Sequence, residues 1–390
     1  MMIGINRLII VFGILAVLLA LGGCIATSNP VSNPGSSTTI TIKDGYSRTV
    51  AVPSGVGKVV CSSGGPCVRY LVYMDAADMI AGVDSGDQPN STSSTTRDTR
   101  SYTLANPGFA ALPVIGSSSG GANLESIMVI QPQLIFMMGS ATNQTGETVS
   151  PADTMQDKTG IPVVALPSGA YTTEEGRAQL YSSYRLIGKI LGKESRAEEL
   201  IAFIEATIAD LDRRTRDIPE SQQKTAYIGG LSYGGSHGLM STQSEYPPFL
   251  WVHVKNIANG SIIQTTEFSR ESLIYADPEF IFIDAGTLGV TDEIGGLDAI
   301  RSPVFADMQA VRSGNIYATL PYNYRSSNLD TILADAYFVG KVVYPDRFAD
   351  IDPKVKADEI YTMFVGEPVF EKINANCDNL GFGKIILSGG

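Results

Sequence analysis

Two segments of this chain repeat each other at a constant spacing, and this repeat limits the possible fold more than any other feature. Each copy has a capping residue, a glutamate two positions later, a proline and then an Ile-Phe pair. Asn123 and Glu125 begin the first copy, and Ser269 and Glu271 begin the second, 146 positions further on. Each copy predicts a helix cap, a short apolar helix, a proline stop and a buried strand. The repeat therefore predicts two similar lobes.

A long amphipathic stretch from Ser195 to Arg216 lies between the two copies. Its apolar residues recur at steps of three, four and seven, which predicts one buried stripe along a helix of roughly 33 Å. The stripe consists of Ala197, Leu200, Ile201, Ile204, Ile208 and Leu211. Ser195 and Glu198 have the spacing of a capping box, and Pro219 ends the pattern. We expect this helix to be a stiff connection between the lobes.

Strand-like runs alternate with short helical segments on both sides of this helix, which predicts parallel sheets covered on both faces. The expected fold class is α/β, with two Rossmann-like lobes that have parallel central sheets and are joined by a single long rigid helix. A chain of 390 residues is long enough for two cores. The predicted parts are a signal peptide at 1–24, a flexible tether at 25–39, an N-terminal lobe at 40–172, connecting helices at 173–218 and a C-terminal lobe at 219–390.

The first 24 residues have the pattern of a secretion signal. Arg7 precedes an apolar run from Leu8 to Ala20, which is too short for a comfortable membrane span. Cys24 follows small residues and resembles the cysteine of a lipobox, which becomes lipid-modified after cleavage. A plain signal peptide cut nearby and an uncleaved anchor are the alternatives. All three place the protein outside the cytoplasmic membrane, and the lipid anchor would hold it on the outer face.

Charge and the metal-binding residue types exclude several classes of function. The net charge is −12 with no basic run, which argues against a nucleic-acid partner. Only two histidines, His237 and His253, are present, too few for the usual cluster of a bare divalent-metal receptor, so we expect a complexed or organic ligand and no metal site or cofactor. Cys61 and Cys67 are spaced for a small disulfide loop, but Cys377 leaves an odd count and the pairing open.

Taken together, these motifs resemble one family. The chain looks like a solute-binding lipoprotein of an ABC importer, of the iron-complex, haem and cobalamin type. The resemblance rests on Cys24, on the opening Asp44-Gly-Tyr-Ser-Arg-Thr-Val-Ala-Val-Pro53, on the two glutamate segments and on the long helix, and it covers about residues 40 to 385. It implies a monomer with two α/β lobes that binds its ligand in the cleft between them, moves little at the hinge, and delivers the ligand to an ABC permease.

Glu125 and Glu271 are candidates for the contact with that permease. A carboxylate in the first turn of a helix also complements the helix dipole, which is a purely structural explanation. The resemblance instead implies that one glutamate per lobe docks onto arginines of the permease. Two like charges on separate lobes would then match a symmetric partner at two points.

The candidate ligand-binding residues lie near strand ends and glycine-rich turns. Arg69 follows such a turn, and its guanidinium suits the carboxylate or phosphate groups of a chelate, although a solvated surface arginine is the alternative. Tyrosines can bind ferric iron or pack a flat macrocycle, or they can simply be interfacial. The full set is Ser63, Gly64, Arg69, His237, Tyr246, Tyr322, Tyr324 and Arg325. The glycine- and serine-rich loops after Gly116 and Ser232 show no ligand signature, so the cargo stays open among an iron(III) complex, haem and a corrinoid.

A hydrolase is the alternative from a different class. Gly234-Gly-Ser236-His-Gly238 matches the G-x-S-x-G pattern of a nucleophile elbow, with Ser236 as the nucleophile. The elbow requires a helix directly after the serine, and the residues that follow are poor helix formers. We therefore expect a binding protein and not an enzyme. A cell-surface receptor without a transporter is a third possibility.

Overall fold

This computed structural model describes residues 38–62, 67–89, 97–117, 121–139, 151–233, 237–260, 267–288 and 295–387, and the backbone of 264 and 265. The predicted signal peptide with Cys24, nearly all of the tether, and Ser63, Gly64 and Ser236 lie outside the described residues.

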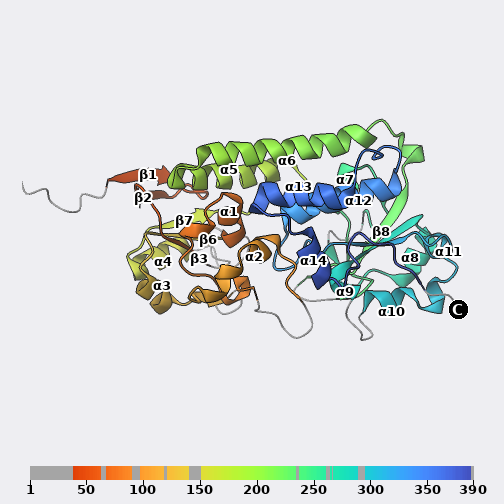
Figure 1. Cartoon of the computed structure of the whole chain (residues 1–390), viewed down its shortest axis with the longest axis horizontal. Helices are drawn as coiled ribbons and strands as arrows, with labels where there is room; N and C mark the ends of the chain where they lie inside the picture. The colour runs from red at the N-terminus through yellow and green to blue at the C-terminus, as the bar shows by residue number, and fades with distance from the viewer. Residues whose placement is uncertain are drawn as a thin grey trace, which may run out of the picture. The chain divides into compact units, whose positions relative to one another are not determined.

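The N-terminal lobe is built on a parallel sheet of order β3-β6-β7 (Figure 1). Its strands are β3 (Val59–Ser62), β6 (Leu134–Met138) and β7 (Val163–Leu166), and every residue in them is buried. Strands buried on both faces read as continuous apolar runs, which explains why the sequence predicted them well.

A β-hairpin is fastened to this lobe through the motif Asp44-Gly-Tyr-Ser-Arg48. It consists of β1 (Thr39–Lys43) and β2 (Thr49–Pro53), paired antiparallel. Asp44 accepts hydrogen bonds from the backbone N–H groups of Tyr46 and Arg48, and the Arg48 guanidinium pairs with both Asp44 and Asp153. A Cβ on Gly45 would lie 2.2 Å from the Pro167 ring, so only glycine allows the turn to approach the sheet this closely.

The C-terminal lobe has a second parallel sheet, of order β10-β8-β12-β13. Its strands are β8 (Thr225–Gly229), β10 (Lys255–Asn256), β12 (Phe280–Asp284) and β13 (Ile316–Thr319). The predicted α/β class with a parallel sheet in each lobe is confirmed. Short antiparallel pairs join β4 (Gly116–Ser117) to β5 (Gly121–Ala122) and β9 (Thr242–Gln243) to β11 (Gln264–Thr265).

Helices cover the sheets and connect their strands. In the first half of the chain they are α1 (Cys67–Tyr73), α2 (Ser101–Ala105), α3 (Leu124–Ile130), α4 (Pro151–Thr159), α5 (Glu174–Leu191) and α6 (Glu194–Thr215). In the second half they are α7 (Pro247–Trp251), α8 (Arg270–Ala276), α9 (Ala285–Leu288), α10 (Gly296–Ile300), α11 (Gln309–Arg312), α12 (Leu329–Val343), α13 (Pro353–Val365) and α14 (Phe370–Asn376).

The predicted repeat is reproduced from cap to strand. The side chain of Asn123 accepts from the N–H of Ser126, and the side chain of Ser269 accepts from the N–H of Ser272. Helix α3 ends at Gln131 and α8 at Asp277, both in the left-handed conformation. All bounds of α3 and β6 recur 146 positions later in α8 and β12, as the matching caps and apolar positions predicted.

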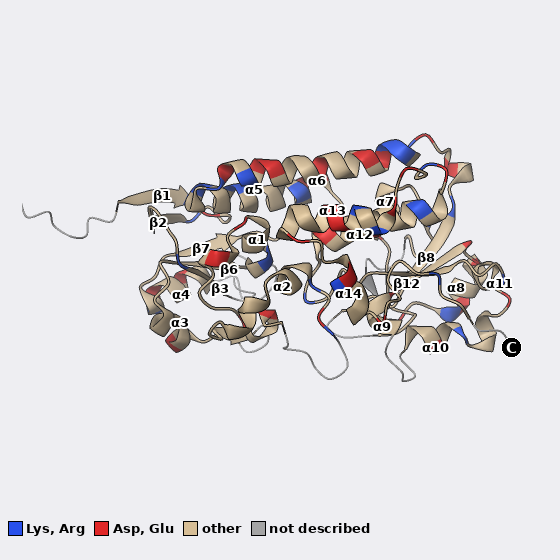
Figure 2. Ribbon diagram, viewed as in Figure 1, with Lys and Arg blue, Asp and Glu red and all other residues tan. Residues whose placement is uncertain are grey.

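The long helix α6 has the predicted buried stripe, but it begins differently. The capping-box prediction is wrong, because the N-cap is Lys193 and Ser195 lies inside the helix. Helix α5 ends at Gly192 in the left-handed conformation, so α6 follows almost at once, and Glu198 pairs with Arg185 of α5 instead. Both α5 and α6 carry acidic and basic residues (Figure 2).

Helix α6 contacts both lobes. Near its start, Arg196 donates to the Tyr73 carbonyl of α1 and to the Met363 carbonyl of α13. Near its end, Arg214 forms a bidentate pair with Asp350, which follows α12. Helices α13 and α14 also contact α2, so the C-terminal helices lie against the N-terminal lobe as well as against their own.

Candidate ligand-binding and docking sites

Arg69 lies in the first turn of α1, two residues after the disulfide-bonded Cys67. Cys61 at the end of β3 and Cys67 at the start of α1 form a disulfide with a Cα–Cα distance of 5.7 Å, which settles the pairing that the sequence left open. The Arg69 side chain is fully buried, and its Nη1 donates to Asn328 Oδ1 at 2.6 Å. Asn328 caps α12 of the other lobe and donates to the carbonyls of Tyr322 and Tyr324. Arg69 is thus held at a contact between the lobes.

Two of the three nitrogens of this guanidinium have no hydrogen-bond partner among the residues that the structure describes. Nε and Nη2 of Arg69 have no hydrogen bond within the described part of the chain, and no acidic side chain there forms an ion pair with Arg69. Tyr102 lies under the guanidinium at 5.9 Å. The buried Asp330 carboxylate is close enough for the Arg69 charge to oppose the rise of its pKa on burial, but it does not bind the two open nitrogens. Buried donors that lack an acceptor are costly, so this arrangement favours an anionic group from outside the chain.

Arg100 is also buried nearby, but all three nitrogens of its guanidinium donate hydrogen bonds. It donates from Nε and Nη2 to Asp98, and from Nη1 to the Tyr102 hydroxyl at 3.1 Å. Its guanidinium also lies 5.4 Å from the Tyr102 ring and 5.6 Å from the Tyr324 ring. Arg100 therefore shapes the wall of the region, whereas Arg69 has free donors.

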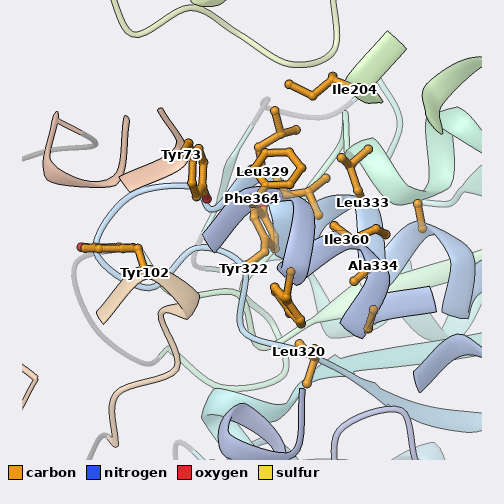
Figure 3. Packing of buried hydrophobic residues seen from close by; sticks show 14 of the residues in the cluster. Tyr73, Tyr102, Ile204, Leu320, Tyr322, Leu329, Leu333, Ala334, Ile360 and Phe364 are labelled. Atoms are coloured by element: carbon orange, nitrogen blue, oxygen red, sulfur yellow. The ribbon is translucent and has the colours of Figure 1, made fainter. Parts of the chain in front are cut away.

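An acid from α12 completes this interlobe cluster, which we define as Arg69, Arg100, Tyr102, Asn328 and Asp330. Asp330 is fully buried and accepts from the Ser101 hydroxyl. Burial raises the pKa of Asp330 above its ordinary value, although hydrogen bonds to Ser101 and the Thr331 N–H oppose the shift. Close by, Tyr73 of α1 packs edge-on against Phe364 of α13, with ring centres 4.7 Å apart (Figure 3).

The other predicted ligand residues are spread around the C-terminal lobe. Tyr324 lies half-buried beneath Arg100, and Arg325 is exposed with a φ of 50°. Tyr322 and Tyr246 are buried with ring centres 5.7 Å apart, and the Tyr322 hydroxyl donates to Gln243. The structure therefore brings Arg69 and Tyr324 together, but it packs Tyr246 in a core.

His237 lies elsewhere. It is exposed, and its Nε2 is 2.9 Å from the Tyr233 carbonyl oxygen. With Arg270 and Phe305 it lines a hollow of about 210 Å³ beside α8. This places His237 beside one of the two repeated helices and outside the interlobe cluster.

Sequence reasoning missed Arg100, Ser101, Tyr102, Asn328 and Asp330. The segment around Tyr102 reads as a polar loop because Ser, Thr, Asp and Arg dominate it. Asn328 and Asp330 stand at the start of an apolar helix, where polar residues are common for helix capping and for the helix dipole. Their position therefore gave no sign of a binding role. Their shared location depends on the contact between lobes, which no local pattern encodes.

Glu125 and Glu271 occupy matching places in the first turns of α3 and α8, and both are exposed. The Glu271 backbone N–H and the Ser269 hydroxyl, which donates at 2.9 Å, hold the pKa of Glu271 below its ordinary value. One turn later stand Val129, 84% exposed, and Tyr275, 93% exposed, which are the most exposed large apolar side chains in the described ranges. Each helix thus presents an acid and an apolar side chain on the surface.

Two further properties limit the possible sites. Within the described ranges, no group of three or more His, Cys, Asp and Glu residues is arranged to hold a metal ion. None of the helices described here combines the length and apolar character needed to cross a membrane.

The sequence matches a family model described as periplasmic binding protein over residues 71–322. The molybdate-binding protein MolA of Haemophilus influenzae is 20% identical over 341 residues, which cover 83% of this chain and 90% of MolA. The solved structure of MolA bound to molybdate matches with a TM-score of 0.64 at 18% identity, covering 84% of this chain and 98% of that one.

Two other solved structures share the fold and bind different ligands. The petrobactin-binding protein YclQ of Bacillus subtilis has a TM-score of 0.56 at 18% identity, covering 79% of this chain and 99% of YclQ. The periplasmic haem-binding protein HutB of Vibrio cholerae has a TM-score of 0.52 at 19% identity, covering 74% of this chain and 100% of HutB.

These are binding proteins and not enzymes, which confirms the expected absence of catalysis and removes the hydrolase alternative. The chain belongs to the periplasmic binding protein family, the extracytoplasmic substrate-binding components of ABC importers.

Proposed function

We propose that this protein captures an anionic iron(III) complex, haem or corrinoid between its lobes and delivers it to an ABC permease. The observation that carries the proposal is the buried Arg69 guanidinium with two donors unused. Carboxylates, phosphates and the oxygens of an iron chelate all accept two parallel hydrogen bonds from such a fork. The Tyr102 and Tyr324 rings beside the two arginines add aromatic surface for a flat or bulky ligand.

The position of Arg69 supports recognition by closure. Its Nη1 already binds Asn328 of the opposite lobe, so an anion at Nε and Nη2 would lie beside the contact that joins the lobes. Binding would compensate the buried charge, and the closed arrangement would gain stability only when the anion is present.

A molybdate-like oxyanion is the second candidate cargo. It is favoured by the similarity to MolA, which extends over most of both chains. The same two donors of Arg69 would bind an oxyanion, whereas the nearby tyrosine rings would contribute little to it. The two candidates therefore differ in how much they depend on the aromatic residues.

For delivery, we propose that α3 and α8 dock on the permease through Glu125 and Glu271. The support is their matched position, their exposure and the apolar residues Val129 and Tyr275 one turn further on. An exposed acid next to an exposed apolar side chain, presented twice, suits a partner that offers one basic and apolar patch in each of two copies.

The experiment that tests the cargo is recovery of the full-length protein from native membranes, followed by absorption spectroscopy, mass spectrometry and metal analysis. An iron chelate, haem or corrinoid is expected, with absorption in the visible range. Molybdenum without an organic component would favour the second candidate. A neutral or cationic organic ligand would contradict both.

The Cys24 anchor is part of the same proposal. We propose that lipid at Cys24 holds the protein on the outer face of the membrane as a monomer. Mass measurement of the mature N-terminus tests this, and a Cys24→Ala variant that remains membrane-bound would contradict it.

A further inference from the structure

Two buried carboxylates stand at the carboxyl end of the C-terminal sheet without any counter-charge. Asp284 ends β12 and Asp335 lies in the second turn of α12, and both are almost completely buried. One oxygen of Asp284 accepts from the Gly286 N–H at 2.8 Å, and one oxygen of Asp335 accepts from the Leu320 N–H at 2.9 Å. The second oxygen of each has no hydrogen-bond partner, and neither acid forms an ion pair, in the part of the chain that the structure describes.

An aromatic layer fixes the geometry just below these acids. The Phe282 ring packs against rings from three other elements, namely Phe249 at 5.5 Å, Tyr317 at 5.9 Å and Phe338 at 6.2 Å between ring centres. This layer brings together one side chain each from β12, α7, β13 and α12. Any side chains one step further towards the carboxyl end of the sheet must also converge.

The next layer is polar, and it contains both acids. Asp284 is two residues beyond Phe282 on the same face of β12, and Asp335 is one turn before Phe338 on α12. Thr319 is paired in register with Asp284, and Tyr246 precedes Phe249 by one turn, with its ring 4.8 Å from that of Phe249. Leu320 and Ala334, the chain neighbours of Thr319 and Asp335, are labelled in Figure 3.

The hydroxyls of this layer are as unsatisfied as the carboxylates. Thr319 and Tyr246 are completely buried, and burial raises the pKa of Tyr246, although its hydroxyl is close enough to that of Thr319 for Thr319 to oppose the shift. Neither Thr319 Oγ1 nor the Tyr246 hydroxyl has a hydrogen-bond partner of good geometry within the described ranges. Buried polar atoms in native proteins are nearly always satisfied by protein, water or an ion. These four groups come from β12, β13, α12 and the N-cap of α7, and no basic side chain in the described ranges pairs with either acid.

We propose that Asp284, Asp335, Thr319 and Tyr246 form an internal Ca²⁺ site that holds β12, β13 and α12 together. The donors are all oxygens, as hard cations require, and the two carboxylates balance a charge of +2. Calcium accepts irregular shells completed by water, whereas zinc prefers nitrogen and sulfur and magnesium demands a near-ideal octahedron. An extracytoplasmic protein meets enough calcium to fill even a weak site.

The competing explanation is that the carboxyl groups stay protonated and no ion binds. Burial does raise the pKa of Asp284 to about 8 and raises that of Asp335 as well. The two explanations make opposite predictions for added calcium. If the carboxyl groups are protonated, calcium should neither bind nor change the Tm. If they form a cation site, one Ca²⁺ should bind per chain and raise the Tm.

The test is isothermal titration of the chelator-treated full-length protein with CaCl2, together with thermal unfolding in calcium or in EDTA. One Ca²⁺ per chain and a higher Tm in calcium are expected. Asp284→Asn and Asp335→Asn should each weaken binding by at least about tenfold. The matched control is Asp307→Asn at an exposed position, which should bind as the parent protein does.

Thr319→Val keeps the side-chain shape and replaces the hydroxyl by a methyl group. A loss of calcium binding in this variant can therefore be assigned to the missing oxygen and not to misfolding. It should fold normally and bind calcium several-fold more weakly. The proposal is overturned if the parent protein neither binds calcium nor gains stability from it, if sodium or magnesium replaces calcium fully, or if the two Asp→Asn variants bind as tightly as Asp307→Asn.

Discussion

At the scale of single residues, Arg69 and Arg100 show how two buried arginines can have different roles. Arg100 uses its guanidinium on Asp98 and on the Tyr102 hydroxyl and ring, so it is a fixed part of the framework. Arg69 donates from Nη1 to Asn328, and its Nε and Nη2 have no hydrogen-bond partner in the described part of the chain. The difference in partners, and not in burial, makes Arg69 the residue that suits an external anion.

Replacing Arg69 by Gln should weaken binding of the native cargo by at least about 30-fold, because a buried charge pair typically contributes 2 kcal/mol or more. Titration calorimetry with the ligand recovered from membranes measures this. The affinity of Arg69→Lys for the cargo should lie between those of the parent protein and Arg69→Gln, because lysine keeps the charge but cannot form two parallel hydrogen bonds. Arg216→Gln, at the exposed C-cap of α6, is the control. Unchanged affinity in Arg69→Gln would show that Arg69 is a structural residue.

The glycine-rich turn predicted Arg69 as a ligand residue, but not its surroundings. Asn328 lies 259 positions away, and a contact of that kind depends on how the lobes meet. Tyr246 was predicted as a ligand residue from its neighbourhood, yet its ring packs on Phe249 in a core. Local pattern shows that a tyrosine lies near a strand end, and only the packing shows where its ring points.

At the scale of elements, α3 and α8 are the most informative pair. Their caps, bounds and buried residues agree position by position because each copy carries its own local signals, a capping side chain at the start and a proline after the end. The start of α6 was predicted wrongly because Gly192, which ends α5, decides it. Elements with self-contained signals were therefore predictable, and elements positioned by a neighbour were not.

Reversing the charge on both helices tests docking. Glu125→Arg combined with Glu271→Arg should reduce cargo uptake by cells at least about tenfold while the Kd for the cargo changes by less than about twofold. Uptake of radiolabelled cargo by cells measures the first effect, and titration calorimetry measures the Kd for the cargo. Glu194→Arg changes an exposed first-turn glutamate on α6 and should leave uptake intact. Equal loss of uptake in all variants, or a parallel loss of affinity, would argue against docking through α3 and α8.

A pH-dependent contact ties α6 to α12. Burial would raise the pKa of Asp210, but hydrogen bonds from Arg214 and Tyr337 lower it below its ordinary value. This stabilisation is present above the unfolded-state pKa of about 4 and is lost as the pH falls through the lower folded-state pKa. Asp210→Asn should therefore cost roughly 1 kcal/mol at pH 7 and much less at pH 3. Urea unfolding at both pH values measures it, and a pH-independent loss would contradict the assignment.

At the scale of the whole molecule, contacts between distant parts of the chain decide how the two lobes meet. The disulfide joins the end of β3 to the start of α1, α13 and α14 lie against α2, and α6 contacts both lobes. Alternating strands and helices predicted the two sheets, because each strand is a continuous apolar run. The boundaries at 40–172, 173–218 and 219–390 stay a prediction, as does the rigidity of α6.

Arg196 is the residue whose loss should affect both lobes at once. Arg196→Ala removes hydrogen bonds to the Tyr73 and Met363 carbonyls and should lower the free energy of unfolding by about 1.5–3 kcal/mol. Arg185→Ala removes an exposed ion pair on the adjacent helix and should cost less than about 1 kcal/mol. Urea unfolding of both variants gives the comparison, and equal losses would show that Arg196 has no special role.

The position of Arg196 also determines where the protein can open. One guanidinium binds main-chain carbonyls of both lobes at the edge next to α6, so we expect that edge to act as the pivot if the lobes open. Rotation of one half against the other leaves atoms near the pivot almost still and displaces atoms further away in proportion to their distance from it. If the lobes rotate about this edge, we expect cargo to enter and leave on the side remote from α6, because the same small rotation separates the lobes most there.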